Sequence, residues 1–238
     1  MALGSKDVVL FDMGYTLIYF EPPMKVTVQE SLQAAGAERT LKEIDAAVQQ
    51  VWEEYYRDAA TTTFPATQEY DRESQYILSQ RLLARLGLPP DEETLRVYHE
   101  AIETGFSQPG ALQLYPEVLN VLESLEAWGY RLGIVSNWSW NLRERVASVG
   151  LTHFFEHVWA SAYAGCNKPH PGIFHQALKQ MEVPADRALY VGDSYEHDVV
   201  GARSAGLDVV LVARDDNVGE ADCIVVRDLR ELLELLSA

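Results

Sequence analysis

The chain contains few cysteines and no long hydrophobic run. Its 238 residues include only two cysteines, Cys166 and Cys223, and they lack the spacing of a metal-binding or redox motif. A fold stabilised by disulfides is therefore not expected, and a reducing, cytoplasmic location is predicted. No stretch approaches the ~18 apolar residues that a membrane-spanning helix needs. We therefore expect no association with a membrane.

Basic residues are also scarce. Lysine and arginine total 19 against 36 aspartates and glutamates, which gives a net charge of −17. The acidic residues are spread along the chain and do not form a tail. A surface of this sign repels nucleic acid and anionic membranes, so neither is an expected partner. A site for a phosphorylated molecule would need its own local positive charge.

The hydrophobic pattern separates two regions. Residues 1–17 and 110–238 alternate strand-like and helix-like segments, which predicts an α/β core with a Rossmann-like parallel sheet and helices on both faces. Residues 18–109 form an insert after the first strand, predicted to be an all-helical cap subdomain. Proline-containing linkers at 19–23 and 105–111 flank it.

The expected elements follow from periodicity, glycines and capping residues. After the first strand, the core strands are predicted at 131–136, 158–160, 188–191, 209–212 and 224–226. The core helices are predicted at 116–128, 140–148, 172–181, 196–205 and 229–236. The insert helices are predicted at 24–35, 41–60, 67–86 and 91–104, the last with Asp91 as its N-cap.

Polar side chains stand at the ends of several predicted strands. Asp12 ends the first strand, Ser136 and Asn137 end another, and Asp193 and Asp198 follow a third. Because the carboxyl ends of parallel strands share one edge of the sheet, these side chains should meet there. Lys168, just before a predicted helix, is expected at the same edge.

These residue types suit phosphoryl transfer. Asp12 could attack phosphorus and form an aspartyl phosphate. The carboxylates could share a Mg²⁺ ion, while Ser136 and Lys168 stabilise negative charge on the phosphoryl group. Each residue alone has a simpler role: Asp12 could cap a turn, Ser136, Asp193 and Asp198 could cap helices, and Lys168 could be solvated. Their ordered combination at successive strand ends favours a site.

Four motifs resemble those of the haloacid dehalogenase-like hydrolase superfamily: FDMGYTL, VSN, NKPHPGIF and VGDSYEHDVVGARSAG. The resemblance implies that Asp12 is the nucleophile and that Ser136 and Lys168 assist it. It also implies a Mg²⁺ site formed by Asp12, the Gly14 carbonyl and Asp193, with Asp198 supporting it. Asn137 could bind the substrate through its backbone N–H or its amide, and Tyr15 through its hydroxyl.

One position departs from that family's phosphatases, which usually have a second aspartate two residues after the nucleophile. That residue protonates the leaving group, and Gly14 replaces it here. The expected activity is Mg²⁺-dependent hydrolysis of a small phosphomonoester, slow for alkyl phosphates because general acid help is worth ~10²–10⁴-fold.

Three other readings stay open. The superfamily's 2-haloacid dehalogenases also lack the second aspartate and use no metal. Its phosphonatases use a lysine of the cap, for which Lys25 is the candidate. A non-catalytic protein that binds a phosphorylated ligand or partner is the third. The sequence predicts neither the physiological substrate nor the oligomeric state.

Overall fold

The computed structural model describes residues 5–214 and 221–237, in two compact units. One unit takes in Met1–Ile18, Ala59–Thr67 and Leu114–Ala238, and the other takes in Tyr19–Asp58 and Gln68–Gln113. Residues 59–67 thus group with the first unit, although they lie within the stretch predicted to be the insert. There the backbone N–H of Phe64 donates to the Gly165 carbonyl at 2.8 Å.

A six-stranded parallel sheet forms the centre of the first unit. Its order is β5-β4-β1-β6-β7-β8. The strands are β1 (Val8–Phe11), β4 (Arg131–Ser136), β5 (His157–Ala160), β6 (Ala188–Gly192), β7 (Asp208–Val212) and β8 (Ile224–Val226). β1 lies between β4 and β6, and all four of its side chains are buried. The predicted α/β fold with a Rossmann-like parallel sheet is confirmed.

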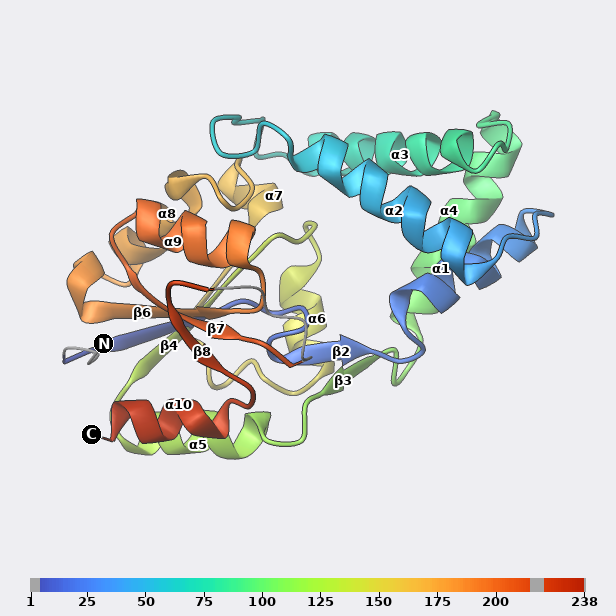
Figure 1. The fold of residues 1–238 in the computed structure, drawn as a ribbon. Coiled ribbons are helices and arrows are strands. Elements are labelled where there is room, and N and C mark those ends of the chain that lie inside the picture. The colour runs from blue at the N-terminus through green and yellow to red at the C-terminus, as the bar shows by residue number, and fades with distance from the viewer. Residues whose placement is uncertain (1–4, 215–220, 238) are drawn as a thin grey trace. The chain divides into compact units, whose positions relative to one another are not determined.

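Helices cover both faces of this sheet, as Figure 1 shows for α8 and α9 on one side and α5 and α10 on the other. These helices are α5 (Val118–Ala127), α8 (Pro171–Gln180), α9 (Gly201–Ser204) and α10 (Arg230–Leu236). The shorter elements are α6 (Leu142–Ser148), α7 (Ser161–Ala164), the 3₁₀ turn η1 (Ala185–Arg187) and the π-helical segment η2 (Tyr195–Val200).

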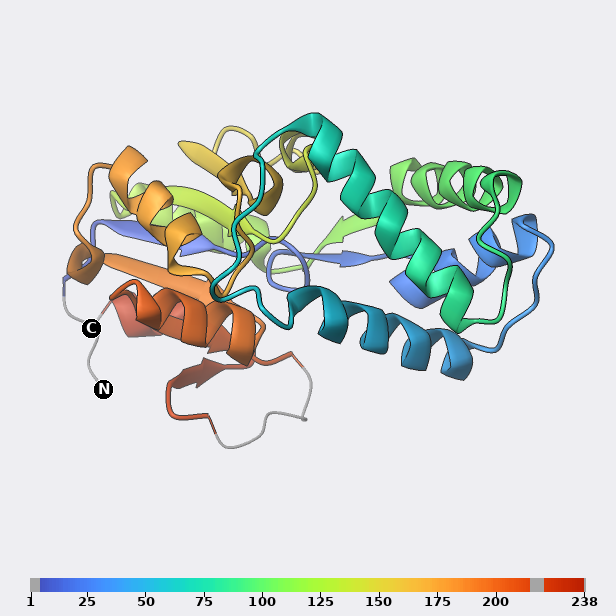
Figure 2. The ribbon, with the colours of Figure 1, turned by 90° about the horizontal axis from the view of Figure 1, so that it is seen from above.

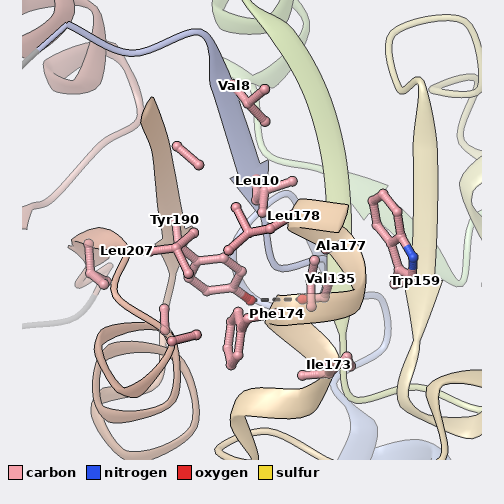
Figure 3. Packing of buried hydrophobic residues seen from close by; sticks show 14 of the residues in the cluster. Val8, Leu10, Val135, Trp159, Ile173, Phe174, Ala177, Leu178, Tyr190 and Leu207 are labelled. Carbon is pink, nitrogen blue, oxygen red and sulfur yellow. Dashed lines mark hydrogen bonds between the residues drawn. The ribbon is translucent and has the colours of Figure 1, made fainter. Parts of the chain in front are cut away.

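The buried core beneath α8 joins the sheet to the site. Leu10, Val135 and Tyr190 from three neighbouring strands pack with Phe174 and Ile173 of α8 (Figure 3). The rings of Phe174 and Tyr190 meet edge to face, with centroids 5.0 Å apart. Tyr190 is therefore held by apolar packing along its ring, and its hydroxyl points to the Val135 carbonyl.

Four helices make up most of the second unit, and they are the long blue-to-green helices of Figure 2. They are α1 (Met24–Ala34), α2 (Leu41–Tyr56), α3 (Gln68–Arg85) and α4 (Glu92–Ser107). Their apolar faces share a core that includes Leu32, Ile44 and Leu83. The side chain of Asp91 accepts a hydrogen bond from Thr94 N–H, which confirms the predicted cap of α4.

The structure corrects the sequence-based boundaries at several points. The first predicted linker is partly a strand, β2 (Ile18–Phe20), and it pairs with β3 (Leu112–Leu114), an unpredicted strand that directly follows the second linker. Three-residue strands are too short to give a periodic pattern. The nearby prolines therefore led to the prediction of a linker. The predicted helix 196–205 begins instead as η2, in which the Val199 N–H bonds to the Ser194 carbonyl five residues back. Within the described residues, no helix is long and apolar enough to span a membrane.

Candidate active site

The candidate site is built around Asp12, the residue that follows β1. Its backbone N–H donates to the Val191 carbonyl at 2.9 Å, which continues the strand pairing to the edge of the sheet. Its carboxylate is buried. A carboxylate is thus presented at the carboxyl end of a central parallel strand, where open α/β sheets bind ligands.

Lys168 is the positive charge at this edge. Its buried Nζ donates to Asp12 Oδ1 at 2.6 Å, to Asp198 Oδ1 at 2.6 Å and to the Tyr190 hydroxyl at 2.9 Å. An ammonium has three hydrogens, so these three acceptors satisfy it completely. The Tyr190 hydroxyl in turn donates to the Val135 carbonyl at 2.7 Å, the dashed line in Figure 3.

Two more acidic side chains follow β6, Asp193 directly after the strand and Asp198 within η2. Thr16, in the loop after Asp12, donates its hydroxyl to Asp193 Oδ1 at 3.3 Å. Asp198 accepts a second hydrogen bond, at Oδ2, from the Ser194 N–H at 2.9 Å. One oxygen each from Asp12, Asp193 and Asp198 lies within 4.8 Å of the others. The predicted carboxylates therefore do converge.

A glycine permits this close approach. A Cβ at Gly192 would lie 2.3 Å from the Asp198 carboxyl carbon, closer than any real contact. The chain at the end of β6 can therefore pass directly beneath the Asp198 side chain only because residue 192 has none.

Burial and mutual repulsion set the charge of the cluster. Burial raises the pKa of Asp12, and Lys168 opposes that rise. Burial also raises the pKa of Asp193 well above its ordinary value, and the charges of Asp12 and Asp198 add to the effect. Burial alone would lower the pKa of Lys168, yet the same two carboxylates hold it above its usual range.

The donor set of this cluster fits a hard divalent cation. Three carboxylates face one ammonium, so the buried cluster is short of positive charge when all three are ionised. Oxygen-only ligands in a small space are what Mg²⁺ binds in proteins. The raised pKa of Asp193 is the physical sign that the chain alone does not neutralise it.

Ser136 and Asn137 flank Lys168 and Asp12. Ser136, the buried last residue of β4, hydrogen-bonds to the Asp12 carboxyl group. Asn137 accepts from the Lys168 backbone N–H at 2.7 Å and donates to the Lys168 carbonyl at 3.0 Å. The Asn137 amide therefore fixes the lysine backbone. Asn137 is predicted to bind the substrate, and that prediction is not tested by any contact that the structure describes. Because its side-chain amide bonds to the Lys168 backbone, its backbone N–H is the group that would bind the substrate.

Gly14 and Tyr15 follow the nucleophile candidate. A Cβ built on Gly14 would lie 3.6 Å from the Trp138 ring, and no other described residue beyond its chain neighbours comes within 4 Å. Tyr15 adopts a φ of 55°, in the left-handed region, and its side chain is 43% exposed. The roles predicted for Asp12, Gly14, Tyr15 and the other site residues stay predictions, because position alone does not show function.

Sequence reasoning missed two members of the network, Thr16 and Tyr190. Both are fully buried with hydroxyls bonded to site residues. Tyr190 could have been noticed as the one hydroxyl in the otherwise apolar strand Ala188–Gly192.

The chain matches a known protein family along most of its length. Residues 9–212 match the model of the family described as haloacid dehalogenase-like hydrolase. A protein of Methanopyrus kandleri, named glyceraldehyde 3-phosphate phosphatase, is 28% identical over 96% of this chain and 97% of its own length. One of the same name from Methanothermobacter thermautotrophicus is 34% identical over 52% of this chain, and that match spans only 59% of the relative.

Solved structures share the fold. The putative hydrolase YfnB from Bacillus subtilis superposes with a TM-score of 0.77 at 21% identity, over 99% of this chain and all of that one. A 2-haloacid dehalogenase from Pseudomonas syringae gives a TM-score of 0.67 at 22% identity, over 98% of both chains. With the family model matched over residues 9–212, the chain belongs to the haloacid dehalogenase-like hydrolase family.

Proposed function

We propose that this protein is a Mg²⁺-dependent phosphatase that hydrolyses a small phosphomonoester through an aspartyl phosphate on Asp12. The observation that supports the proposal best is the convergence of Asp12, Asp193 and Asp198, of which Asp12 and Asp198 are buried and bonded to Lys168. Relatives named glyceraldehyde 3-phosphate phosphatase and phosphoglycolate phosphatase support a small phosphorylated substrate. The two cysteines without a motif support a reducing, cytoplasmic location, and the acidic composition argues against a nucleic-acid or membrane partner.

The first half of the reaction uses the Asp12 oxygen that Lys168 does not hold. Asp12 Oδ1 accepts from Lys168, so Oδ2 is the atom that would attack phosphorus. The new O–P bond forms as the ester P–O bond breaks, and the leaving oxygen takes the bonding pair. Ser136 and the Asn137 N–H would bind phosphoryl oxygens while Lys168 neutralises charge that develops on them. The bond from Asn137 to the lysine backbone keeps that ammonium in place.

The second half is hydrolysis of the acyl phosphate. Water attacks phosphorus, the Asp12 O–P bond breaks, and inorganic phosphate leaves with the Asp12 carboxylate restored. A Mg²⁺ ion held by Asp12, the Gly14 carbonyl and Asp193, with support from Asp198, would neutralise the carboxylates and the phosphoryl oxygens.

Substrate preference would follow from the missing acid. Gly14 offers no proton to the departing oxygen, so esters of acidic alcohols should react best. Aryl and acyl phosphates release phenolates and carboxylates, which are stable anions. Alkyl phosphates release an alkoxide, which needs the proton. The Trp138 ring beside Gly14 supplies an apolar surface where the acid would otherwise stand.

A metal-independent 2-haloacid dehalogenase is the second candidate. It is favoured by the same Gly14, since a halide leaves without a proton, and by Asp12, Ser136 and Lys168. The carboxylates of Asp193 and Asp198 argue against it, because two extra negative charges would repel an anionic haloacid from a metal-free site.

The test compares two substrates with and without Mg²⁺. Metal-dependent release of phosphate from p-nitrophenyl phosphate, lost in Asp12→Asn, is the expected result. Metal-independent halide release from 2-chloropropionate would replace the proposal with the dehalogenase. If neither substrate is turned over, a ligand-binding role without catalysis becomes the better explanation.

A further inference from the structure

One arginine from a distant strand holds the loop that follows Asp12. Arg214 lies just beyond the end of β7, and β6 separates that strand from β1. Its Nη2 donates to the Thr16 carbonyl at 2.6 Å, and its Nε donates to the Tyr15 carbonyl at 3.2 Å. The side chain therefore reaches past one strand to bind two consecutive carbonyls of the nucleophile loop.

The guanidinium makes two further contacts, with Glu117 and Tyr115. Nη1 donates to Glu117 Oε1 at 2.7 Å, and the guanidinium carbon lies 3.4 Å from the centre of the Tyr115 ring. The Glu117 side chain is 5% exposed and that of Arg214 is 16% exposed. A buried carboxylate without its partner is strongly unfavourable, so this pair is fixed in place. Arg214 thus joins the loop to Glu117 and Tyr115 through three N–H groups and one face of its guanidinium.

The loop needs such external support. Tyr15 has a φ of 55°, in the left-handed region that is strained for a residue other than glycine. Strained residues of this kind persist only where their surroundings hold them. The loop is also joined to the site at both ends, because Asp12 precedes it and the Thr16 hydroxyl donates to Asp193. A shift at Tyr15 would therefore move the two carboxylates relative to each other.

We propose that Arg214 is a positioning residue that sets the conformation of residues 14–16 and so aligns Asp12, the Gly14 carbonyl and Asp193 for a divalent cation. Glu117 and Tyr115 orient the guanidinium for this purpose. The inference rests on the proposed function for its effect on turnover, but its effect on cation binding can be measured without any substrate.

The test uses Arg214→Lys, which keeps a positive charge beside Glu117 but cannot donate to both loop carbonyls through a planar fork. Arg187→Lys is the matched control, because Arg187 makes a similar ion pair with Asp7 just before β6, at the other end of the sheet. Binding of Mg²⁺ alone is followed by the rise in the thermal unfolding midpoint as MgCl₂ is added. Turnover is followed with p-nitrophenyl phosphate.

We expect Arg214→Lys to raise the Mg²⁺ concentration for half-saturation by about 10- to 100-fold, the range typical of residues that orient metal ligands. We expect the kcat of Arg214→Lys to fall by a similar factor, with little change in KM. Arg187→Lys should match the parent in both the Mg²⁺ half-saturation and kcat. A folded Arg214→Lys protein with parental half-saturation and kcat would overturn the inference. So would a variant that only lowers the unfolding midpoint in the absence of Mg²⁺.

Tyr115→Leu covers the case in which Arg214→Lys does not fold. It removes the ring beneath the guanidinium and keeps both charges and every nitrogen donor. A smaller shift in the same direction supports the inference, and an unchanged Mg²⁺ response overturns it. A parent protein whose midpoint ignores Mg²⁺ would overturn the proposed function and this inference together, whereas a parent that binds Mg²⁺ but hydrolyses no phosphate ester would overturn only the former.

Discussion

Restoring the missing acid at position 14 should change which phosphate esters the protein hydrolyses. The structure has room for it: the Gly14 backbone lies outside the left-handed region, and an added Cβ would make an ordinary van der Waals contact with Trp138 at 3.6 Å. Gly14→Asp should therefore fold without backbone strain. Its carboxyl group would lie beside an apolar ring, which favours the protonated form that a general acid needs.

The expected size of the effect depends on the leaving group. General acid help is worth ~10²–10⁴-fold, or about 2.7–5.4 kcal/mol at 1.36 kcal/mol for each tenfold change. An alkyl phosphate should gain in this range. An aryl phosphate should gain far less, because a phenolate leaves without a proton.

The assay is kcat/KM with Mg²⁺ for p-nitrophenyl phosphate and for glycerol phosphate. Gly14→Ala is the matched control, since it adds the Cβ next to Trp138 without adding an acid. The reasoning would be refuted if both esters gained equally, or if Gly14→Ala reproduced the gain. Either result would mean that the change acts through loop conformation and that another group already supplies the proton.

Three further substitutions test the site and the fold. Asp12→Asn should fold and release no phosphate with Mg²⁺ present, and a retained parental rate would exclude Asp12 as nucleophile. Lys168→Met should lower the free energy of unfolding without Mg²⁺ by about 3–5 kcal/mol in urea, because it leaves Asp12 and Asp198 buried without their cation; a loss below about 1 kcal/mol would contradict that pairing. Burial lowers the pKa of His99, and no described residue pairs with its Nε2. The unfolded chain therefore binds more protons near pH 6, and the protein should lose stability as the pH falls through 6.5. The free energy of unfolding of His99→Phe should therefore fall less than that of the parent between pH 7.5 and 5.5. An equal fall in the two proteins would refute the assignment to His99.

Much of the fold was predictable because it depends on local pattern. β4 at Arg131–Ser136 and β8 at Ile224–Val226 have the predicted bounds, since each is an apolar run between clear turn residues. The pairing of β2 with β3 was not predictable, because it joins two short segments far apart in sequence that sit next to prolines. The π-helical start of η2 was also missed, since an apolar pattern cannot distinguish bonding over four residues from bonding over five.

The sequence by itself determined that acidic and basic groups would gather at one edge of a parallel sheet. The order of strand ends is enough for that, because parallel strands direct all their carboxyl ends the same way. It also determined that position 14 lacks an acid. These two facts define the family and the chemistry that is proposed.

Only the tertiary structure decided how those groups are held. The three hydrogen bonds of Lys168 and the Asn137 amide on its backbone depend on groups from separate strands and loops meeting within about 3 Å. The contact of Arg214 with the Tyr15 and Thr16 carbonyls is of the same kind. Such contacts are fixed by packing and strand order across the sheet, over some 200 residues of chain, and no local pattern encodes them.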